Sequence, residues 1–295
     1  MANIPITSKK STKLYIPHPH EETGSIAGVL EQLSPGESTH GRRIALIMHG
    51  TMGHKDYLFQ KRLALRFPVD SFRFDFRANF ESPGTFSFGK IELEVIDLHV
   101  VADYLMKQYG YVIDLLVGHS KGSVVAMLWL CTYPKSETGS VRGYVNVSGR
   151  YRVEKMYDQM RKPENQQQLA AQGFYELKAT VARKPVVHRI TEQDHHEFAG
   201  IDTTIVWNRF PKEIHVLTMH GLRDTVVPPY DAIIYAEAYS SRTEGTHNLY
   251  IVDEADHNFT GMADHVAATI LQWVSLLDRN ELKTGIWPSG LKPKL

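Results

Sequence analysis

The stretch VIDLLVGHSKGSVVAMLWLCTY, residues 112–133, contains the two elements that decide the fold. The apolar run before residue 118 predicts a buried strand, and the run from residue 121 predicts a helix that is apolar on nearly all sides. GHSKG, residues 118–122, stands between them. A serine held between flanking glycines at a strand-to-helix turn projects its hydroxyl clear of the backbone. Ser120 is therefore a candidate nucleophile.

From about residue 40 onward, short β-rich runs alternate with helix-length amphipathic segments. This alternation predicts an α/β fold with a mostly parallel sheet of about eight strands and helices on both faces. Two leading runs, 12–17 and 25–33, predict an antiparallel edge of that sheet. The other predicted strands are 42–50, 71–77, 112–120, 141–149, 213–221 and 247–257, and the predicted helices are 56–67, 90–110, 121–133, 230–240 and 262–279.

The segment 150–212 interrupts the alternation. It is polar and has no strand-helix pair in the ordinary register, which favours an insertion over the sheet. Its composition predicts helices over 152–174, a hairpin over 173–190 and one or two short helices over 191–210. We therefore expect a core domain formed by 1–149 and 213–295, with a helix and hairpin lid over 150–212.

A serine nucleophile needs a histidine base and a carboxylate that orients the base. Asp224 follows the predicted strand 213–221, and His257 follows the apolar part of the run 247–257. Both residues are expected at the carboxyl ends of strands, where ligands bind in doubly wound sheets. The order serine, acid, histidine along the chain is that of the α/β-hydrolase arrangement.

Other residues compete for these roles. The acids Asp253, Glu254 and Asp256 are neighbours of His257 in the chain, and a residue on the same loop does not readily reach round to its Nδ1 atom. His119 is expected to point away along the turn, and His220 to be a core histidine at a strand end. We favour Asp224 and His257 for these reasons.

Ester chemistry also requires two backbone N–H groups that converge on the developing oxyanion. One is expected from Lys121, the residue after the serine. The other is expected from Thr51, because HGT, residues 49–51, follows the predicted strand 42–50. Only backbone amides are needed, so we assign no chemical role to either side chain.

Five segments together resemble the α/β-hydrolase superfamily, in its serine-hydrolase branch of cinnamoyl and feruloyl esterase-like and monoacylglycerol lipase-like (serine aminopeptidase S33-type) enzymes. They are MHGTMGHKD (48–56), FRFDFRANFESPG (72–84), GHSKG (118–122), HGLRDTVVP (220–228) and DEADHNF (253–259). The family pattern usually has glycine at the positions of Ala78 and Phe80. Their loop borders the active site in the family, so the resemblance implies that Phe80 shapes the substrate pocket.

The insertion supplies further candidates. The aromatic residues Phe174, Tyr175 and Trp207 either line the substrate pocket or form a small core within the lid, and the sequence leaves both alternatives open. His195 and His196 lie beside acidic residues, but adjacent residues on a helix point to different faces. We expect them on a solvated lid surface and predict no metal site.

Composition limits the other classes of function. Lys plus Arg and Asp plus Glu each total 33, and no long run of one sign occurs, which argues against a nucleic-acid partner. No segment has the length of a membrane span, and the N-terminal stretch lacks a signal-peptide run. The single cysteine, Cys131, excludes an internal disulfide. We expect a cytoplasmic protein without a cofactor; a homodimer is left open.

The sequence thus predicts a carboxylic ester hydrolase that acts on small or medium acyl or aryl esters. Two alternatives stay open. A thioesterase, acyltransferase or peptidase uses the same three residues, since they do not encode the leaving group. A ligand-binding protein of the same fold is the alternative outside enzymes, and the complete set of site residues disfavours it.

Overall fold

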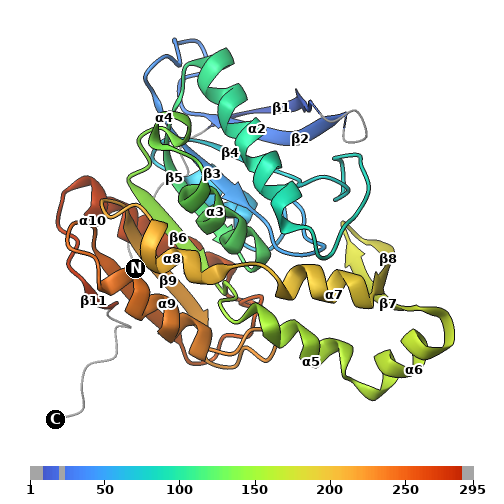
Figure 1. Cartoon of the computed structure of the whole chain (residues 1–295). Helices are drawn as coiled ribbons and strands as arrows, with labels where there is room; N and C mark the ends of the chain where they lie inside the picture. Colours follow the sequence, from blue (N-terminus) through green and yellow to red (C-terminus); the bar gives the residue numbers. More distant parts are fainter. Residues whose placement is uncertain (1–8, 20–23, 288–295) are drawn as a thin grey trace.

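The computed structural model describes residues 9–19 and 24–287. Part of the N-terminal stretch that argues against a signal peptide, residues 1–8, lies outside the described residues. The described strands form one nine-stranded sheet in the order β1-β2-β4-β3-β5-β6-β9-β10-β11 and a separate two-stranded sheet, β7-β8 (Figure 1). Within the large sheet β1 and β2 pair antiparallel, as do β2 and β4, and the remaining pairs are parallel.

The strands of the large sheet are β1 (Lys10–Pro17), β2 (Ser25–Gln32), β3 (Arg43–Met48), β4 (Asp70–Phe74), β5 (Val112–His119), β6 (Gly143–Val147), β9 (His215–Gly221), β10 (His247–Val252) and β11 (Gly285–Ile286). The helices outside the insertion are α1 (Gln60–Arg66), α2 (Ile91–Tyr109), α3 (Lys121–Thr132), α4 (Lys135–Thr138), α9 (Tyr230–Ser240) and α10 (Ala263–Asp278).

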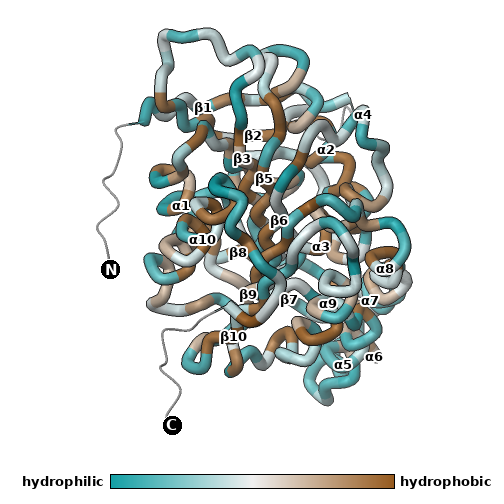
Figure 2. The backbone as a smooth tube through the Cα atoms, turned by 90° about the vertical axis from the view of Figure 1, so that its left-hand side faces the viewer, coloured by the Kyte–Doolittle hydropathy of each residue, from teal (hydrophilic) through white to brown (hydrophobic). Residues whose placement is uncertain are grey.

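Helices cover both faces of the sheet, and each face has its own hydrophobic core. Because successive side chains of a strand point to opposite faces, Leu46 of β3 joins the core under α2, α3 and α9, while Ile47 joins the core under α1 and α10. Figure 2 shows the apolar strands between these two layers of helices. Burial on both faces explains the apolar runs Ile44–Met48 in β3 and Leu115–Val117 in β5.

The segment between β6 and β9 adds no strand to the large sheet. It contains η1 (Val153–Lys155), α5 (Met156–Met160), α6 (Pro163–Gln172), β7 (Phe174–Val181), β8 (Lys184–Thr191), α7 (Glu192–Ala199), η2 (Thr203–Ile205) and α8 (Val206–Arg209). Strands β7 and β8 pair as an antiparallel hairpin. The segment contacts the core through Phe88, whose ring lies 5.5 Å from that of Phe198 in α7.

The predicted fold class is confirmed: the sheet is mostly parallel, and helices flank it on both sides. Two short elements escaped the sequence analysis. The ninth strand, β11, has two residues, and the helix α4 has four, so neither is long enough to show a hydrophobic periodicity.

Cys131 is buried in α3, and burial raises the pKa of its thiol to about 12.

Candidate active site

Ser120 occupies a strained turn between β5 and α3. Its backbone angles are φ 52° and ψ −120°, a conformation that non-glycine residues rarely adopt. The flanking glycines allow the close packing that holds the turn. A Cβ atom on Gly118 would lie 2.5 Å from the carbonyl oxygen of Gly122, and one on Gly122 would lie 2.4 Å from that of His49. The elbow geometry expected from GHSKG is therefore present.

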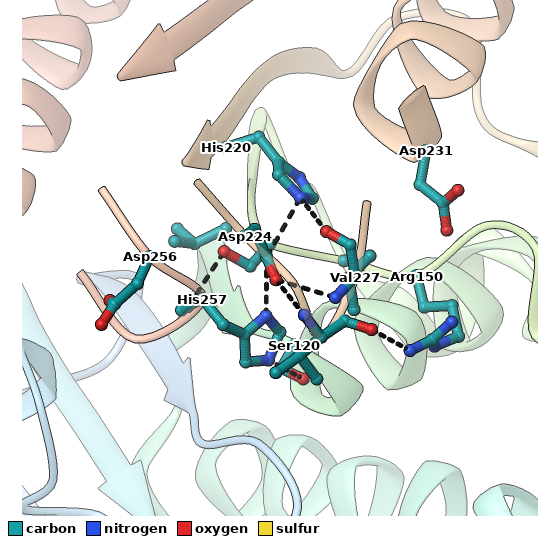
Figure 3. A network of polar contacts seen from close by, with 12 residues as sticks. Ser120, Arg150, His220, Asp224, Val227, Asp231, Asp256 and His257 are labelled. Atoms are coloured by element: carbon teal, nitrogen blue, oxygen red, sulfur yellow. Dashed lines mark hydrogen bonds and ion pairs between the residues drawn. The ribbon is translucent and has the colours of Figure 1, made fainter. Parts of the chain in front are cut away.

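A chain of hydrogen bonds runs from Ser120 through His257 to Asp224. The Nε2 atom of His257 lies 2.9 Å from Ser120 Oγ, and its Nδ1 atom lies 2.7 Å from Asp224 Oδ2 (Figure 3). A carboxylate oxygen only accepts, so Nδ1 carries the proton and Nε2 is free to accept the serine hydroxyl proton. The fold thus brings together three residues that lie more than 30 positions from one another in the sequence.

Asp224 is buried, and each of its two carboxylate oxygens has two hydrogen-bonding contacts. Its Oδ1 accepts hydrogen bonds from the amides of Val226, at 2.9 Å, and Val227, at 2.8 Å. Its Oδ2 accepts from His257 and lies 3.2 Å from His220 Nε2. Burial by itself raises the pKa of Asp224, but the hydrogen bonds from His220 and His257 outweigh burial and lower the pKa overall. The carboxylate therefore stays ionised.

His220 has a contact that the sequence analysis missed. The side chain is fully buried at the end of β9, as expected for a core histidine, and its Nε2 also lies 2.8 Å from the carbonyl oxygen of Val227. A carbonyl oxygen only accepts, so Nε2 carries a proton and donates both to Val227 and toward Asp224. The HGLRD sequence places the two residues four positions apart, which was the available signal.

Two of the rival acids near His257, Asp256 and Glu254, have other partners. Asp256 is on the same loop, and its Oδ1 accepts from the amides of Asn258, at 3.1 Å, and Thr260, at 2.9 Å. Glu254 pairs with Arg223 at 2.6 Å, and both side chains are well exposed. Asp224 is the acid that faces the histidine ring.

The backbone carbonyl of His257 is held by His119, the last residue of β5, and by Ser148, the residue that follows β6. His119 Nε2 donates to the carbonyl oxygen of His257 at 2.9 Å, and Ser148 Oγ donates to the same oxygen at 3.1 Å. Burial, followed by the proximity of His257, lowers the pKa of His119 to about 3, so this ring stays neutral. Both contacts fix the loop that carries His257, and the sequence analysis assigned neither.

The loop after β3 packs directly against the serine. A Cβ atom on Gly50 would lie 2.9 Å from Ser120 Cβ, and Thr51 is the next residue along this turn. His49 braces the turn, because its Nδ1 donates to the Gly50 carbonyl oxygen at 2.7 Å and its Nε2 accepts from the Phe76 amide at 3.0 Å. The turn that leads to Thr51 therefore lies beside Ser120, and an oxyanion hole formed by the amides of Thr51 and Lys121 stays a prediction.

The Lys121 side chain is buried away from solvent and forms an ion pair. Its Nζ lies 2.7 Å from Glu94 Oε1 in the first turn of α2, and it also faces the ring of Phe86 at 5.8 Å. Burial raises the pKa of Glu94, and the attraction of Lys121 partly offsets that effect. The pair ties the start of α3 to the start of α2.

The residues at the family's glycine positions adopt glycine-like backbone angles. Ala78 has φ 54° and Phe80 has φ 47°, both in the left-handed region. The Phe80 ring is partly exposed and lies 5.0 Å from the ring of His54 and 4.7 Å from Lys55 Nζ. A role of Phe80 in shaping the substrate pocket stays a prediction.

Each aromatic candidate of the insertion contacts another residue of the same segment. Tyr175 is buried and its hydroxyl lies 2.9 Å from His195 Nε2. Phe174 lies 4.6 Å from the guanidinium of Arg189. Trp207 is exposed and donates to the hydroxyl of Tyr151 at 2.8 Å. Substrate binding by Phe174, Tyr175 and Trp207 stays a prediction.

The expectation of a solvated surface at both lid histidines was wrong for His195. This side chain is fully buried, because α7 turns it toward Tyr175 and Phe88, whereas His196 on the other face is exposed. In the part of the chain that the structure describes, no three His, Cys, Asp or Glu side chains converge to hold a metal ion.

Comparison with known proteins identifies the class of fold. No protein family model matches the chain. The solved structure of Est1E from Butyrivibrio proteoclasticus with bound ferulic acid superimposes with a TM-score of 0.67 at 16% identity, covering 90% of this chain and 99% of that one. The Pyrococcus furiosus esterase Pf2001 gives 0.62 at 14% identity, covering 90% of each chain. The chain has the α/β-hydrolase fold.

Two further proteins are similar to this chain. Mouse alpha/beta hydrolase domain-containing protein 10 superimposes with a TM-score of 0.62 at 13% identity, over 90% of this chain and 99% of that one. The uncharacterized protein YDL057W of Saccharomyces cerevisiae is 25% identical over 235 residues, which cover 75% of this chain and 70% of the yeast protein. Among the described residues, no helix has both the length and the apolar character that crossing a bilayer requires.

Proposed function

We propose that this protein is a serine carboxylic ester hydrolase that acts on small or medium acyl or aryl esters. The observation that carries the proposal is the hydrogen-bond chain from Ser120 Oγ through His257 to Asp224. The strained serine, the helix that starts beside it and the buried carboxylate are the features that nucleophilic catalysis of acyl transfer requires.

In the proposed mechanism, Ser120 Oγ attacks the ester carbonyl carbon while His257 Nε2 takes the hydroxyl proton. The amides of Thr51 and Lys121 hold the oxyanion, and the dipole of α3 favours negative charge at this position. The alcohol leaves with the proton from His257. Water then attacks the acyl-enzyme, His257 takes and returns its proton, and the carboxylic acid is released as Ser120 is restored. Asp224 holds the imidazole in the required tautomer throughout.

The substrate class rests on two supports. The resemblance to feruloyl esterase-like and monoacylglycerol lipase-like enzymes favours an aryl ester or a monoacylglycerol. Est1E, which has a similar fold, has been solved with ferulic acid bound. We therefore propose hydroxycinnamoyl-type esters or monoacylglycerols as the first substrates to examine. The proposed catalytic residues need no metal or organic cofactor.

The test is a panel of p-nitrophenyl esters of increasing chain length together with methyl ferulate and a monoacylglycerol. We expect Ser120→Ala to lower kcat by about 10⁶-fold, to the level of residual binding catalysis. Ser136→Ala, at an exposed position on α4, is the matched control and should leave kcat unchanged. A fluorophosphonate should label the wild type but not Ser120→Ala. Undiminished ester hydrolysis by Ser120→Ala would exclude Ser120 as the nucleophile.

A further inference from the structure

Arg150 reaches the candidate site from the strand that separates the nucleophile from the acid. In the sheet, β6 lies between β5 and β9, and all three strands run parallel. Their carboxyl ends therefore meet at one edge, where Ser120 follows β5, Arg150 follows β6 and Asp224 follows β9. Figure 3 shows the Arg150 side chain pointing toward the loop that carries Asp224.

The guanidinium of Arg150 is buried but incompletely partnered. The residue is only 7% exposed, and its Nη2 donates to the carbonyl oxygen of Val226 at 2.5 Å. Within the described residues, Nε and Nη1 form no hydrogen bond, and Arg150 takes part in no ion pair. Neither nitrogen is among the fully enclosed polar atoms that lack a partner, so both still face accessible space. Both nitrogens therefore keep donor capacity that the described residues do not use.

Asp231 and Asp224, whose charges act most strongly on Arg150, are occupied by other groups. Asp231 Oδ1 pairs with Arg152 Nε at 2.5 Å, and Asp231 Oδ2 accepts from the Tyr151 amide at 3.0 Å. Asp224 is held by two histidines and two amides, as described above. Burial lowers the pKa of Arg150, and the more distant charges of Asp231 and Asp224 offset this only in part. A mostly buried guanidinium without a direct carboxylate partner is a position at which an anionic ligand would be favourable.

Resting on the proposed esterase function, we infer that Arg150 is a specificity-determining residue that binds a carboxylate group on the substrate. The guanidinium is planar and presents several N–H donors in a fixed geometry that matches a carboxylate. Arg150 follows β6, which lies between the strands that lead to Ser120 and Asp224, so the guanidinium is on the sheet edge where the scissile ester would lie. The preferred substrates are therefore esters with a free carboxylate on either the acyl or the alcohol part.

Two matched pairs of esters test the inference and distinguish the two parts of the substrate. Monomethyl adipate and methyl hexanoate differ only in a carboxylate in place of a methyl group on the acyl side. The butyrate esters of 4-hydroxybenzoate and 4-methylphenol differ in the same way on the alcohol side. We expect wild type to have at least a tenfold higher kcat/KM for the carboxylate ester in one pair, after correction for intrinsic reactivity in buffer.

We expect Arg150→Met to lower kcat/KM for both esters of a pair, because Val226 loses its hydrogen bond. The loss of kcat/KM for the carboxylate ester should be at least tenfold larger than the loss for its neutral partner, chiefly through a higher KM. Arg150→Lys keeps the charge and should retain part of the preference. Arg161→Met removes an exposed arginine of the insertion and is the control. Equal losses for both esters, or no preference for the carboxylate in either pair of the wild type, would overturn the inference.

Calorimetry separates failure of the inference from failure of the proposed function. Adipate and 4-hydroxybenzoate are titrated into Ser120→Ala, which cannot turn over an ester by the proposed mechanism. Binding of one of them that is lost in Ser120→Ala/Arg150→Met supports a carboxylate subsite, even if no ester of the panel is hydrolysed. Absence of binding by both carboxylates overturns the subsite, whatever the esterase activity.

Discussion

Asp224 illustrates how a single carboxylate is kept charged inside the protein. Two amides and two histidine rings donate to it, and these hydrogen bonds exceed the unfavourable effect of burial on its charged form. The same contacts fix the direction from which the carboxylate meets His257 Nδ1. The same four donors therefore keep Asp224 charged and set its orientation.

Replacing Asp224 and Asp256 in turn should show which of the two acids orients His257. We expect Asp224→Asn to lower kcat by about 10⁴-fold, because an amide nitrogen at this position favours the wrong imidazole tautomer. Asp256→Asn is the matched control on the His257 loop, where the carboxylate only caps two amides, and should change kcat less than threefold. Ester hydrolysis by both variants is measured at saturating substrate. The reverse order of effects would assign the acid to Asp256.

His220 is proposed as a positioning residue for Asp224. His220→Leu removes a hydrogen bond to a buried carboxylate, a contact worth about 1.5–3 kcal/mol, so kcat should fall about 10- to 100-fold. With fewer donors, the Asp224 carboxylate should accept more strongly from His257, which moves the acidic limb of the pH–kcat profile to higher pH. His220→Gln retains an N–H donor and should restore part of both quantities. A profile that does not move in His220→Leu would leave His220 as a packing residue only.

At the scale of elements, the junction between β5, α2 and α3 combines backbone strain with a buried charge pair. Ser120 is strained at the start of α3, and the first residue of that helix, Lys121, pairs with Glu94 in the first turn of α2. The strain persists because the surrounding packing determines it, with Gly118 and Gly122 in close backbone contact. The ion pair adds a side-chain link between the same two helices.

Replacing one member of the Lys121–Glu94 pair should lower the free energy of unfolding more than expected from the effect of replacing both. Lys121→Met leaves the carboxyl of Glu94 buried without its partner, and we expect a loss of about 3 kcal/mol in the free energy of unfolding. The double variant Lys121→Met/Glu94→Gln should lose less than the sum of the two single variants. Urea unfolding of all four proteins completes the cycle. Additive losses would contradict a direct interaction between the two residues.

At the scale of the whole molecule, buried histidines make stability depend on pH. Burial lowers the pKa of His49, His119 and His247 to about 3, whereas an unfolded histidine titrates near about 6.5. Between these values the unfolded chain binds more protons than the folded protein, so the free energy of unfolding falls as pH falls. The stabilisation is complete above about pH 6.5, and each histidine accounts for up to about 1.4 kcal/mol per pH unit below it.

Urea unfolding between pH 7.5 and 5 measures this dependence. His247 offers a test away from the candidate site, because its ring nitrogens contact Ser240 Oγ and Thr218 Oγ1, both at 3.0 Å. We expect His247→Gln to reduce the slope of stability against pH by about one third of the contribution of the three histidines. An unchanged slope in this variant would show that His247 binds protons equally in the folded and unfolded protein, contrary to a lowered pKa in the folded state.

The sequence predicted the elements that carry a strong local signal. The helix expected over 90–110 is α2, the hairpin expected over 173–190 is β7 and β8, and the strand before GHSKG is β5. Long amphipathic or doubly buried segments display their period many times, so they are readable without tertiary information. The fold class followed because strands and helices alternate, and chain order placed Ser120, Asp224 and His257 at the same sheet edge.

The sequence by itself determined the fold class and selected Ser120, Asp224 and His257 as candidates, because these depend on local period and chain order. Only the tertiary structure decided that His220 and two amides hold Asp224, that Lys121 is buried against Glu94, and that Arg150 lies between nucleophile and acid. Such contacts join residues whose side-chain directions and neighbours are set by how the elements pack, and a linear pattern contains no record of that packing.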